Sequence, residues 1–466
     1  MDNNENIVVE LEHEKDSFDE SLDKKNALNG HHSHHHHESS HHHHSHHHHH
    51  HHHSHHSSKT HHSKKEKYKR FFKRYKYRIF NIIIAVLFIS VLVVLGFSLD
   101  KQFSSGKENN TDAEQNIGMN EINSSMQIEI PIFNEDVVIV GTAVTSFMES
   151  DSPDAVRVYK KLSGYGRLDT GLPVKIAFNV KNMPEGYAVR SSEVFVSEKS
   201  DVSSPQVFSL SGKESSVDVY HLKTNTQYYY RISLSLSNGS KTSVDGSFKT
   251  ADTPRVLSVD GVYNMRDIGG WKTVDGFRIR QGLLYRSTEL DGAVKKEYTI
   301  TPDGVNTMLS VLGIKTELDL RYESENPNGI NPLGAAVKHN YYGAPMYSEA
   351  FSEDGKKAIR AVFADLADKN NYPVLLHCTH GMDRTGTVSY LLEALLGVGE
   401  EDLMRDYQLS ALHHGDLWAL NQMNEFIGGL KSYEGYTIRE KAESYLLSIG
   451  VTSTEISAIR EIFLDK

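Results

Sequence analysis

The stretch of sequence that decides the fold is Val374-Leu-Leu-His-Cys-Thr-His-Gly-Met-Asp-Arg-Thr-Gly386. Its first residues are apolar, which is typical of a buried strand that ends at Cys378. Five residues then separate Cys378 from Arg384, and we expect a helix to begin at Thr385 or Gly386. The pattern therefore predicts a strand, a short loop and a helix, with the loop at the carboxyl end of the strand.

A loop of this length can curl around one phosphate group. Its backbone N–H groups would point inward, above the positive end of the following helix. Arg384 offers a planar fork that matches two phosphate oxygens. Because the same positive field favours a thiolate, Cys378 is a candidate nucleophile that would attack phosphorus and form a phosphocysteine intermediate.

The sequence after Pro254 alternates between strand-like and helix-like segments. Residues 314–320 and 374–378 are predicted strands, and apolar residues recur at helical spacing in 358–367 and 388–396. Alternation of this kind predicts an α/β domain, with a central sheet flanked by helices and active groups at the carboxyl ends of its strands.

These residues resemble the cysteine-dependent protein tyrosine phosphatases, whose signature is His-Cys, five residues, Arg, then Ser or Thr. The chain is more narrowly similar to the bacterial tyrosine/serine phosphatase branch over about 255–466, and we expect the catalytic domain at 251–466. The further motifs of that branch occur in the same order in this sequence: Asn264-Met-Arg266-Asp267-Ile-Gly269-Gly270, Gly282–Ser287, Asp319-Leu-Arg321, Asp406–Ser410 and Tyr445–Val451.

The resemblance implies roles for the residues of the loop. Cys378 would be the nucleophile, Arg384 the phosphate clamp and Thr385 a hydrogen-bond donor to the sulfur. His377 would orient the loop. The residues expected to bind substrate are Thr379, His380, Gly381, Met382 and Gly386.

A general acid must protonate the leaving oxygen and then activate water. Asp383 and Asp319 compete for this role, and we rank Asp383 first because it lies nearer the phosphate loop in sequence. The alternative role for Asp319 is a structural salt bridge with Arg321. The residues expected to brace the site are Asn264, Arg266, Asp267 and Arg321. No metal or other cofactor is required in the catalytic site, because thiolate and guanidinium supply the chemistry.

The loop also carries information on the substrate. Relatives that accept phosphoinositides tend to have lysine in place of Met382 and sometimes a basic residue in place of Thr379. Both residues are uncharged here, although His380 could restore part of the charge when protonated. Phosphotyrosine, and then phosphoserine or phosphothreonine, is therefore favoured over inositol lipids.

An all-β sandwich is predicted before this domain, at 131–250. Short strand-like runs at 137–140, 174–180, 188–196 and 228–236 are bounded by turn residues. The segment Leu222-Lys-Thr-Asn-Thr-Gln-Tyr228 and its continuation resemble a late strand of fibronectin type III domains, where a tyrosine corner ties a strand to the preceding loop. Phe248-Lys-Thr-Ala-Asp252 resembles their terminal strand. A module of this kind separates other domains or binds a partner.

The N-terminal segment has an unusual composition. Between His31 and His62 lie 22 of the 29 histidines of the chain, and residues 1–30 are acidic. We expect residues 1–78 to be disordered, because they offer little apolar area to bury. Imidazole binds Zn, Ni and Cu ions, so the tract is a candidate metal buffer. A drifted repeat or an engineered tag remains the alternative.

A membrane span is predicted at 79–99. These 21 residues carry no charge, and a helix of that length spans about 31 Å, close to the hydrocarbon thickness of a bilayer. Nine Lys and Arg side chains lie within 64–78, whereas only Lys101 and Lys107 follow closely. The positive-inside rule therefore predicts a single-pass type II protein of the cell membrane, in contact with lipid, with its catalytic domain outside the cytoplasm. Residues 100–130 would be a polar stalk.

Charge and cysteine content exclude several classes. The net charge is −11, and residues from 79 onward carry −13, which is a poor match for nucleic acid. One cysteine excludes an internal disulfide and a cysteine-only metal cluster. We therefore expect a multidomain, membrane-anchored phosphatase acting on a phosphorylated protein or a small phosphomonoester. Two alternatives stay open: a surface metal-binding or adhesion protein with a vestigial phosphatase domain, and a phosphoinositide phosphatase.

Overall fold

The computed structural model describes residues 126–150 and 154–465, which all belong to one compact unit, Asn110–Lys466. The predicted disordered segment 1–78, the predicted membrane span 79–99 and almost all of the predicted stalk lie outside the described residues. Within the described part of the chain, no helix is both long and apolar enough to cross a bilayer. The predicted domain boundary at 250/251 stays a prediction.

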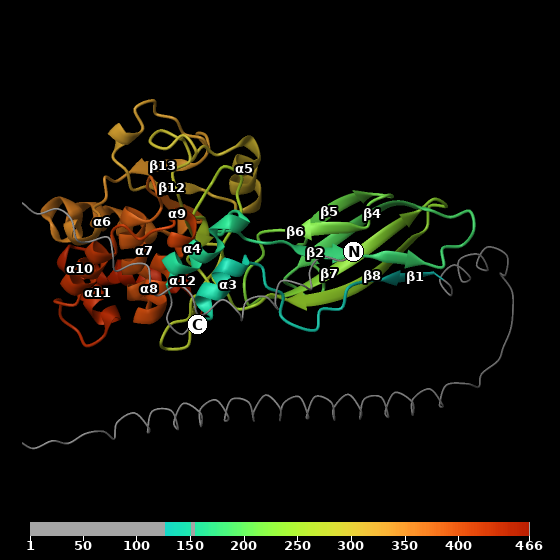
Figure 1. Cartoon of the computed structure of the whole chain (residues 1–466), viewed down its shortest axis with the longest axis horizontal. Helices are drawn as coiled ribbons and strands as arrows, with labels where there is room; N and C mark the ends of the chain where they lie inside the picture. The colour runs from blue at the N-terminus through green and yellow to red at the C-terminus, as the bar shows by residue number, and fades with distance from the viewer. Residues whose placement is uncertain (1–125, 151–153, 466) are drawn as a thin grey trace, which may run out of the picture. The chain divides into compact units, whose positions relative to one another are not determined.

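Antiparallel strands form the β-rich part of the molecule (Figure 1). Four of them make a sheet in the order β5-β4-β7-β8, while β2 pairs with β6 and β1 with β3. Alternate residues of β7, among them Tyr230, Ile232 and Leu234, are buried in one shared core, as expected for a strand with one face toward the core. The strands are β1 (Gln127–Glu129), β2 (Val174–Ala177), β3 (Asn179–Lys181), β4 (Val189–Ser197), β5 (Gln206–Ser211), β6 (Ser216–Val219), β7 (Gln227–Leu236) and β8 (Lys241–Lys249).

Strand β1 and the side chain of Tyr228 can be compared with the predictions for this part. The stalk was predicted to extend to residue 130, but β1 pairs with Asn179–Lys181 and therefore already belongs to a sheet. Tyr228 Oη accepts a hydrogen bond of 2.9 Å from the backbone N–H of Lys223, which is the strand-to-loop tie that the sequence suggested. The assignment to the fibronectin type III family stays a prediction.

The expectation of β-structure throughout 131–250 is wrong for two segments, which form helices α3 (Thr142–Met148) and α4 (Ala155–Leu162). Phe147 is fully buried in the core of the α/β part. Arg405 of that part donates hydrogen bonds to the carbonyl oxygens of Phe147 and Met148. Helices of seven and eight residues span about two turns, too few for their periodicity to be recognised in sequence, and their β-branched residues favoured strands.

The α/β architecture predicted for the remainder is confirmed. Its five-stranded sheet has the order β13-β12-β14-β11-β9, in which only β9 runs antiparallel to its neighbour. The strands are β9 (Arg266–Asp267), β11 (Leu284–Ser287), β12 (Thr316–Asp319), β13 (Lys338–Tyr341) and the central β14 (Val374–His377); two further short strands, β10 (Arg278–Ile279) and β15 (Leu464–Asp465), pair with each other. The helices are α5 (Pro302–Asn306), α6 (Glu353–Leu366), α7 (Asp383–Leu396), α8 (Glu400–Leu409), α9 (Ala411–His414), α10 (Leu420–Leu430), α11 (Ile438–Ser448) and α12 (Ser453–Phe463).

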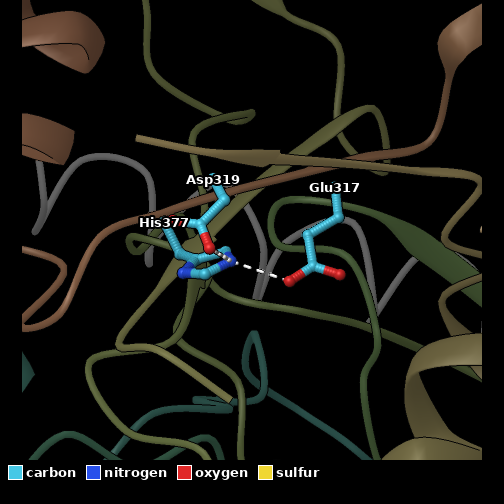
Figure 2. Close-up of side chains that lie close together, drawn as sticks. All are labelled: Glu317, Asp319 and His377. Carbon is cyan, nitrogen blue, oxygen red and sulfur yellow. Dashed lines mark hydrogen bonds and ion pairs between the residues drawn. The ribbon is translucent and has the colours of Figure 1, made fainter. Parts of the chain in front are cut away.

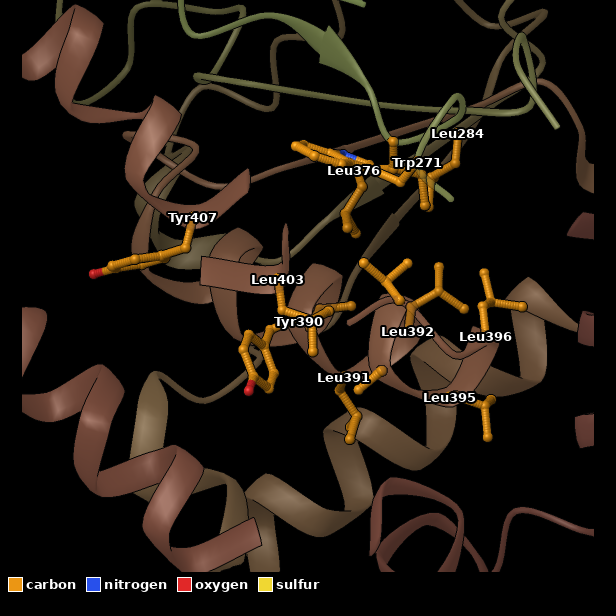
Figure 3. Close-up of a cluster of buried hydrophobic side chains, with 14 of the residues drawn as sticks. Trp271, Leu284, Leu376, Tyr390, Leu391, Leu392, Leu395, Leu396, Leu403 and Tyr407 are labelled. Atoms are coloured by element: carbon orange, nitrogen blue, oxygen red, sulfur yellow. The ribbon is translucent and has the colours of Figure 1, made fainter. Parts of the chain in front are cut away.

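The central strand β14 is buried on both faces, as a strand in the middle of a parallel sheet must be. Val374 and Leu376 face the larger core, which α7 fills from the helical side, while Leu375 belongs to a separate core. Figure 3 shows Leu376 of the strand across from Leu392 of the helix. Every residue of α7 except Arg384 is buried, so the helix lies in the interior and holds the loop before it in one place.

We predict that Phe147→Ala lowers the free energy of unfolding of the α/β part by about 3–5 kcal/mol, because the substitution leaves a cavity in its core. Urea or thermal denaturation of the full chain would measure the change. Tyr165→Ala, at a side chain 83% exposed, is the control and should change stability by no more than about 0.5 kcal/mol. Equal effects of the two substitutions would contradict the packing of α3 on this core.

Candidate active site

Cys378 lies at the carboxyl end of β14, between the carboxyl ends of the parallel strands β11 and β12. Its side chain is buried, and the thiol is free. The helix that follows begins at Asp383, two or three residues earlier than predicted, so that Arg384 belongs to its first turn. The loop between strand and helix is therefore Cys378–Met382, and it sits over the positive end of α7.

Three successive carbonyl groups of the loop accept hydrogen bonds from the surrounding scaffold. Each peptide is planar and trans, so its N–H points away from its C=O. The N–H groups of His380, Gly381 and Met382 therefore point toward the inside of the loop, where an anion would lie. The bonds are Glu289 N to Thr379 O (3.1 Å), Asn264 Nδ2 to His380 O (3.2 Å), His414 Nε2 to His380 O (2.9 Å) and Arg286 Nη2 to Gly381 O (2.9 Å).

Gly381 is required by this geometry. Its φ is +66°, and a Cβ atom at this position would lie 2.4 Å from the carbonyl oxygen of Ser287. A side chain would thus be strained both by the backbone conformation and by the neighbouring strand. The loop can approach β11 this closely only with glycine at this position.

A buried ion-pair cluster braces the loop from beneath. Asp406 of α8 binds Arg266 at 2.8 Å and Arg286 at 2.5 Å. Burial alone would raise the pKa of Asp406, but the two guanidinium groups hold it below its usual value. Arg266 also donates to the Asn264 side chain, which itself holds the loop. The sequence placed Asn264 and Arg266 here as supports, but gave no role to Asp406 or Arg286.

Asp267, the remaining predicted support on β9, lies further from the loop. It forms a buried ion pair of 2.6 Å with Arg255 and accepts hydrogen bonds from the N–H groups of Gly269 and Gly282. It therefore organises the turns around β9 and β11 and reaches the loop only through them.

Arg384 is held by Glu325, a residue that the sequence did not single out. Nη1 and Nη2 of Arg384 donate to the two carboxylate oxygens of Glu325 at 2.6 and 2.9 Å. Burial lowers the pKa of Arg384, but the bonds to Glu325 and the charge of Cys378 raise it above its usual value. A guanidinium has five N–H donors, so three remain to donate hydrogen bonds to phosphate oxygens while Glu325 fixes the orientation.

The other loop residues occupy distinct places. Met382 is fully buried in the large core, so its side chain cannot contact a substrate as expected, and only its backbone N–H can. Thr379 is also buried. Gly386 lies against the ring of Tyr407, where a Cβ atom would come within 3.0 Å. Thr385 Oγ1 is buried and has no hydrogen-bond partner among the described residues, so it is free to make the predicted hydrogen bond to the sulfur.

The two candidate acids lie in very different surroundings. Both oxygens of Asp319 accept hydrogen bonds from Arg321, which is the salt bridge that the sequence offered as its alternative role. Burial alone would raise the pKa of Asp319, but His377, His339 and Arg321 together hold it far below its usual value. Asp319 therefore stays ionised and is unsuited to donate a proton.

Asp383 is nearly buried, with 9% of its surface exposed, whereas Asp319 is fully buried. Its Oδ1 accepts a hydrogen bond of 2.5 Å from Tyr347 Oη, which also lies 2.9 Å from Tyr407 Oη. Tyr347 has a φ of +52°, a left-handed backbone conformation that is unfavourable for a residue with a side chain. The sequence did not single out Tyr347, because only its folded neighbourhood connects it with the loop.

His377 belongs to a buried cluster of charged groups behind the loop (Figure 2). Its Nε2 lies 2.8 Å from Glu317 Oε1 and 3.8 Å from Asp319 Oδ2. Burial would lower the pKa of His377, but the carboxylates of Asp319 and Glu317 raise it to about 9. The imidazole is therefore a cation at neutral pH and supports the loop by charge as well as by position.

The same three side chains bring their ligand atoms within 4.8 Å of one another and could in principle hold a metal ion. The chemistry of the donors argues against it. Arg321 already bonds to both oxygens of Asp319, and His377 already bonds to Glu317. A metal would have to displace these bonds beside a guanidinium, so we interpret the group as an ion-pair network.

A second set of supports comes from the chain before β2. Asp169 is buried and accepts a hydrogen bond of 2.7 Å from the backbone N–H of Asn264, whose φ is +50°. Arg167 binds Asp169 at 2.8 Å and also the carbonyl of Val262. This support reaches the loop Cys378–Met382 through Asn264 and comes from a segment that the sequence assigned to the sandwich. No local sequence motif indicates it.

Comparison with known proteins was consistent with these observations. Residues 257–465 match the model of a tyrosine phosphatase family. A protein of Cupriavidus necator, provisionally named a tyrosine-protein phosphatase, is 29% identical over 181 residues, covering 32% of this chain and 61% of that protein. The tyrosine-protein phosphatase of Nostoc commune is 24% identical over 207 residues, covering 34% of this chain and 69% of that protein.

Two solved structures are also similar in part. The core catalytic domain of the PP-IP phosphatase SIW14 from S. cerevisiae is 18% identical with a TM-score of 0.23, covering 34% of this chain and 86% of that one. TpbA from P. aeruginosa is 18% identical with a TM-score of 0.23, covering 37% of this chain and 89% of that one.

We predict that Glu325→Gln weakens the binding of inorganic phosphate by about tenfold or more, because Arg384 loses the charged partner that orients it. Isothermal titration would measure the affinity. Glu323→Gln, at an exposed carboxylate of the same short helix (Glu323–Glu325), is the matched control and should bind phosphate normally. Unchanged affinity in Glu325→Gln would show that Arg384 needs no such partner.

The raised pKa of His377 predicts a pH dependence of stability. Its folded pKa of about 9 exceeds the value of about 6.5 expected in the unfolded chain. The contribution to stability is therefore complete below about pH 6.5 and is lost as the pH rises through about 9. Urea denaturation at pH 6 and 9.5 should show the difference between the native chain and His377→Gln shrinking at the higher pH. A constant difference would mean that His377 is neutral.

Proposed function

Residues 257–465 belong to the tyrosine phosphatase family, and from that premise we propose that this chain hydrolyses phosphomonoesters, phosphotyrosine first, through a covalent intermediate on Cys378. The observation that carries the proposal is the position of Cys378 below inward-pointing N–H groups, beside Arg384. These groups together match the three terminal oxygens of a phosphate that faces the sulfur.

In the first step, the Cys378 thiolate attacks phosphorus and a phosphorus–sulfur bond forms. The bond between phosphorus and the leaving oxygen breaks, and that oxygen takes a proton from a carboxylic acid. In the second step, the same carboxylate takes a proton from water, whose oxygen attacks phosphorus. The phosphorus–sulfur bond then breaks, inorganic phosphate forms and the thiolate is restored. Arg384 and the loop N–H groups would stabilise the charge on the phosphoryl oxygens in both transition states.

We assign the acid–base role to Asp383. It begins α7, directly beside Arg384, and 9% of its surface is exposed, whereas Asp319 is fully buried. The hydrogen bond from Tyr347 fixes its carboxylate in one orientation. Asp319, the other candidate, is occupied by Arg321 and takes the structural role instead.

The substrate preference follows from the charge around the loop. Met382 and Thr379 are uncharged, and burial lowers the pKa of His380 below its usual 6.5, so that His380 is mostly neutral at pH 7. Additional phosphate groups on one ring would find no added cation on the loop itself. This favours a substrate with one phosphate group over a phosphoinositide.

We further propose that residues 79–99 anchor the protein in the cell membrane as a type II single-pass protein, with the phosphatase outside the cytoplasm. The support is the uncharged segment and the basic residues before it. Labelling with a membrane-impermeant thiol reagent in intact cells, after introducing cysteine at Ser104 in a Cys378→Ser background, would test the orientation. Labelling only after cell lysis would reverse the topology.

We predict that Cys378→Ser abolishes turnover of phosphotyrosine by the full chain, while a metal chelator leaves turnover unchanged. Asp383→Asn should lower the rate by about 10²–10⁴. The loss should be greater for phosphotyrosine than for para-nitrophenyl phosphate, because the more acidic nitrophenolate leaves with less need for a proton. Initial-rate assays with both substrates would measure this.

Asp319→Asn serves as the comparison. It should destabilise the fold, by leaving Arg321 and His377 without a shared partner, and any loss of rate should be the same for both substrates. A leaving-group dependence in Asp319→Asn, and none in Asp383→Asn, would exchange the two roles. Activity that is lost on adding chelator would instead favour metal-dependent chemistry.

A further inference from the structure

Aromatic side chains surround one side of the catalytic loop. The ring of His380, the second residue after Cys378, lies 5.3 Å from the Trp418 ring and 5.6 Å from the His414 ring, measured between centroids. His414 and Trp418 lie 5.0 Å apart, which closes a group of three rings. We call His380, His414 and Trp418 the aromatic rim. Tyr298 contacts His380 edge-on at 6.2 Å from the other direction.

The rim is fixed to the loop by its backbone as well as by its rings. His414 Nε2 bonds to the carbonyl oxygen of His380 at 2.9 Å. Trp418 follows α9 by only four residues and is therefore held close to His414. Tyr298, behind the rim, is nearly buried, whereas 47% of Trp418 is exposed. Most of the aromatic surface that the rim offers to a ligand thus belongs to Trp418.

The two histidines of the rim are mostly neutral at pH 7. Burial lowers the pKa of His414 to about 3 and lowers that of His380 below its usual value. The charges that act on the pKa of His380 are two carboxylates, Asp383 and Glu297, and two cations, Lys295 and Arg384, so their effects oppose one another. Neutral aromatic rings attract another ring by stacking or edge-on contact, and offer little to a second phosphate group.

We propose that the aromatic rim is the binding site for the phenyl ring of an aromatic phosphomonoester, with Trp418 as the residue that determines this preference; the inference rests on the phosphatase function proposed above. A phosphate held between the loop N–H groups and Arg384 has its ester oxygen directed away from Cys378, and His380, against which Trp418 packs, belongs to the loop itself. The first atoms beyond that oxygen are a flat ring in phosphotyrosine and a flexible alkyl chain in phosphoserine. Only the ring can stack on Trp418.

Steady-state kinetics of the full chain would test the rim. Trp418→Ala should lower kcat/KM for phosphotyrosine about threefold to tenfold, mainly through KM, and leave kcat/KM for phosphoserine unchanged. Trp418→Phe should retain most of the preference, because a ring remains. Tyr436→Ala, which removes an almost fully exposed ring from another loop, is the control and should alter neither substrate. An equal loss for both substrates in Trp418→Ala would overturn the proposal.

A binding experiment separates failure of the rim from failure of the enzyme. The chain holds two tryptophans, of which Trp271 is nearly buried, so fluorescence reports mainly on changes at Trp418. In Cys378→Ser protein, phosphotyrosine should change the emission and phosphoserine should not, and the change should vanish in Cys378→Ser/Trp418→Phe. No change with phosphotyrosine would overturn the rim, whatever the turnover. A change at Trp418 in a chain whose native form hydrolyses neither substrate would retain the rim and overturn the proposed function.

Discussion

The ion pairs of Asp406 with Arg266 and Arg286 are the interaction on which the site depends. All three side chains are buried, so each charge costs several kcal/mol to remove from water and is tolerable only with its partners in place. Arg286 extends this cluster to the carbonyl of Gly381, and Arg266 extends it through Asn264 to the carbonyl of His380. The orientation of the loop peptides is thus set by charges that cannot be rearranged without exposing one of them.

Electrostatic pre-organisation explains why so many ionised groups lie around one cysteine. His377, Arg286 and Arg384 approach the loop from different elements, and each is matched by a carboxylate that holds it in position. The matched carboxylates keep the cations in place before any ligand arrives. A bound phosphate then meets oriented dipoles and one guanidinium, and little reorganisation is needed at the moment of reaction.

The sequence predicted those parts of the site whose residues lie close together along the chain. The strand before Cys378, the glycine at 381 and the arginine at 384 all follow from one continuous stretch, and the sheet around them follows from apolar runs of strand length. Glu325, Asp169 and Tyr347 were missed because the residues they bind, Arg384, Asn264 and Asp383, lie 59, 95 and 36 positions away along the chain, with no local signal. Helices α3 and α4 were missed for a related reason, since it is their packing on the α/β core, and not their own length or composition, that stabilises them.

The single cysteine of this sequence limits how the site can respond to oxidants. A thiolate oxidised to sulfenic acid is usually rescued when a nearby thiol condenses with it. No second thiol exists in these 466 residues, so an oxidised Cys378 can return to the reduced form only with the help of a small-molecule thiol, another protein, or closure onto a backbone nitrogen. The burial that orients the sulfur also restricts which reductants can reach it. Recovery from peroxide would thus depend on the surroundings of the protein.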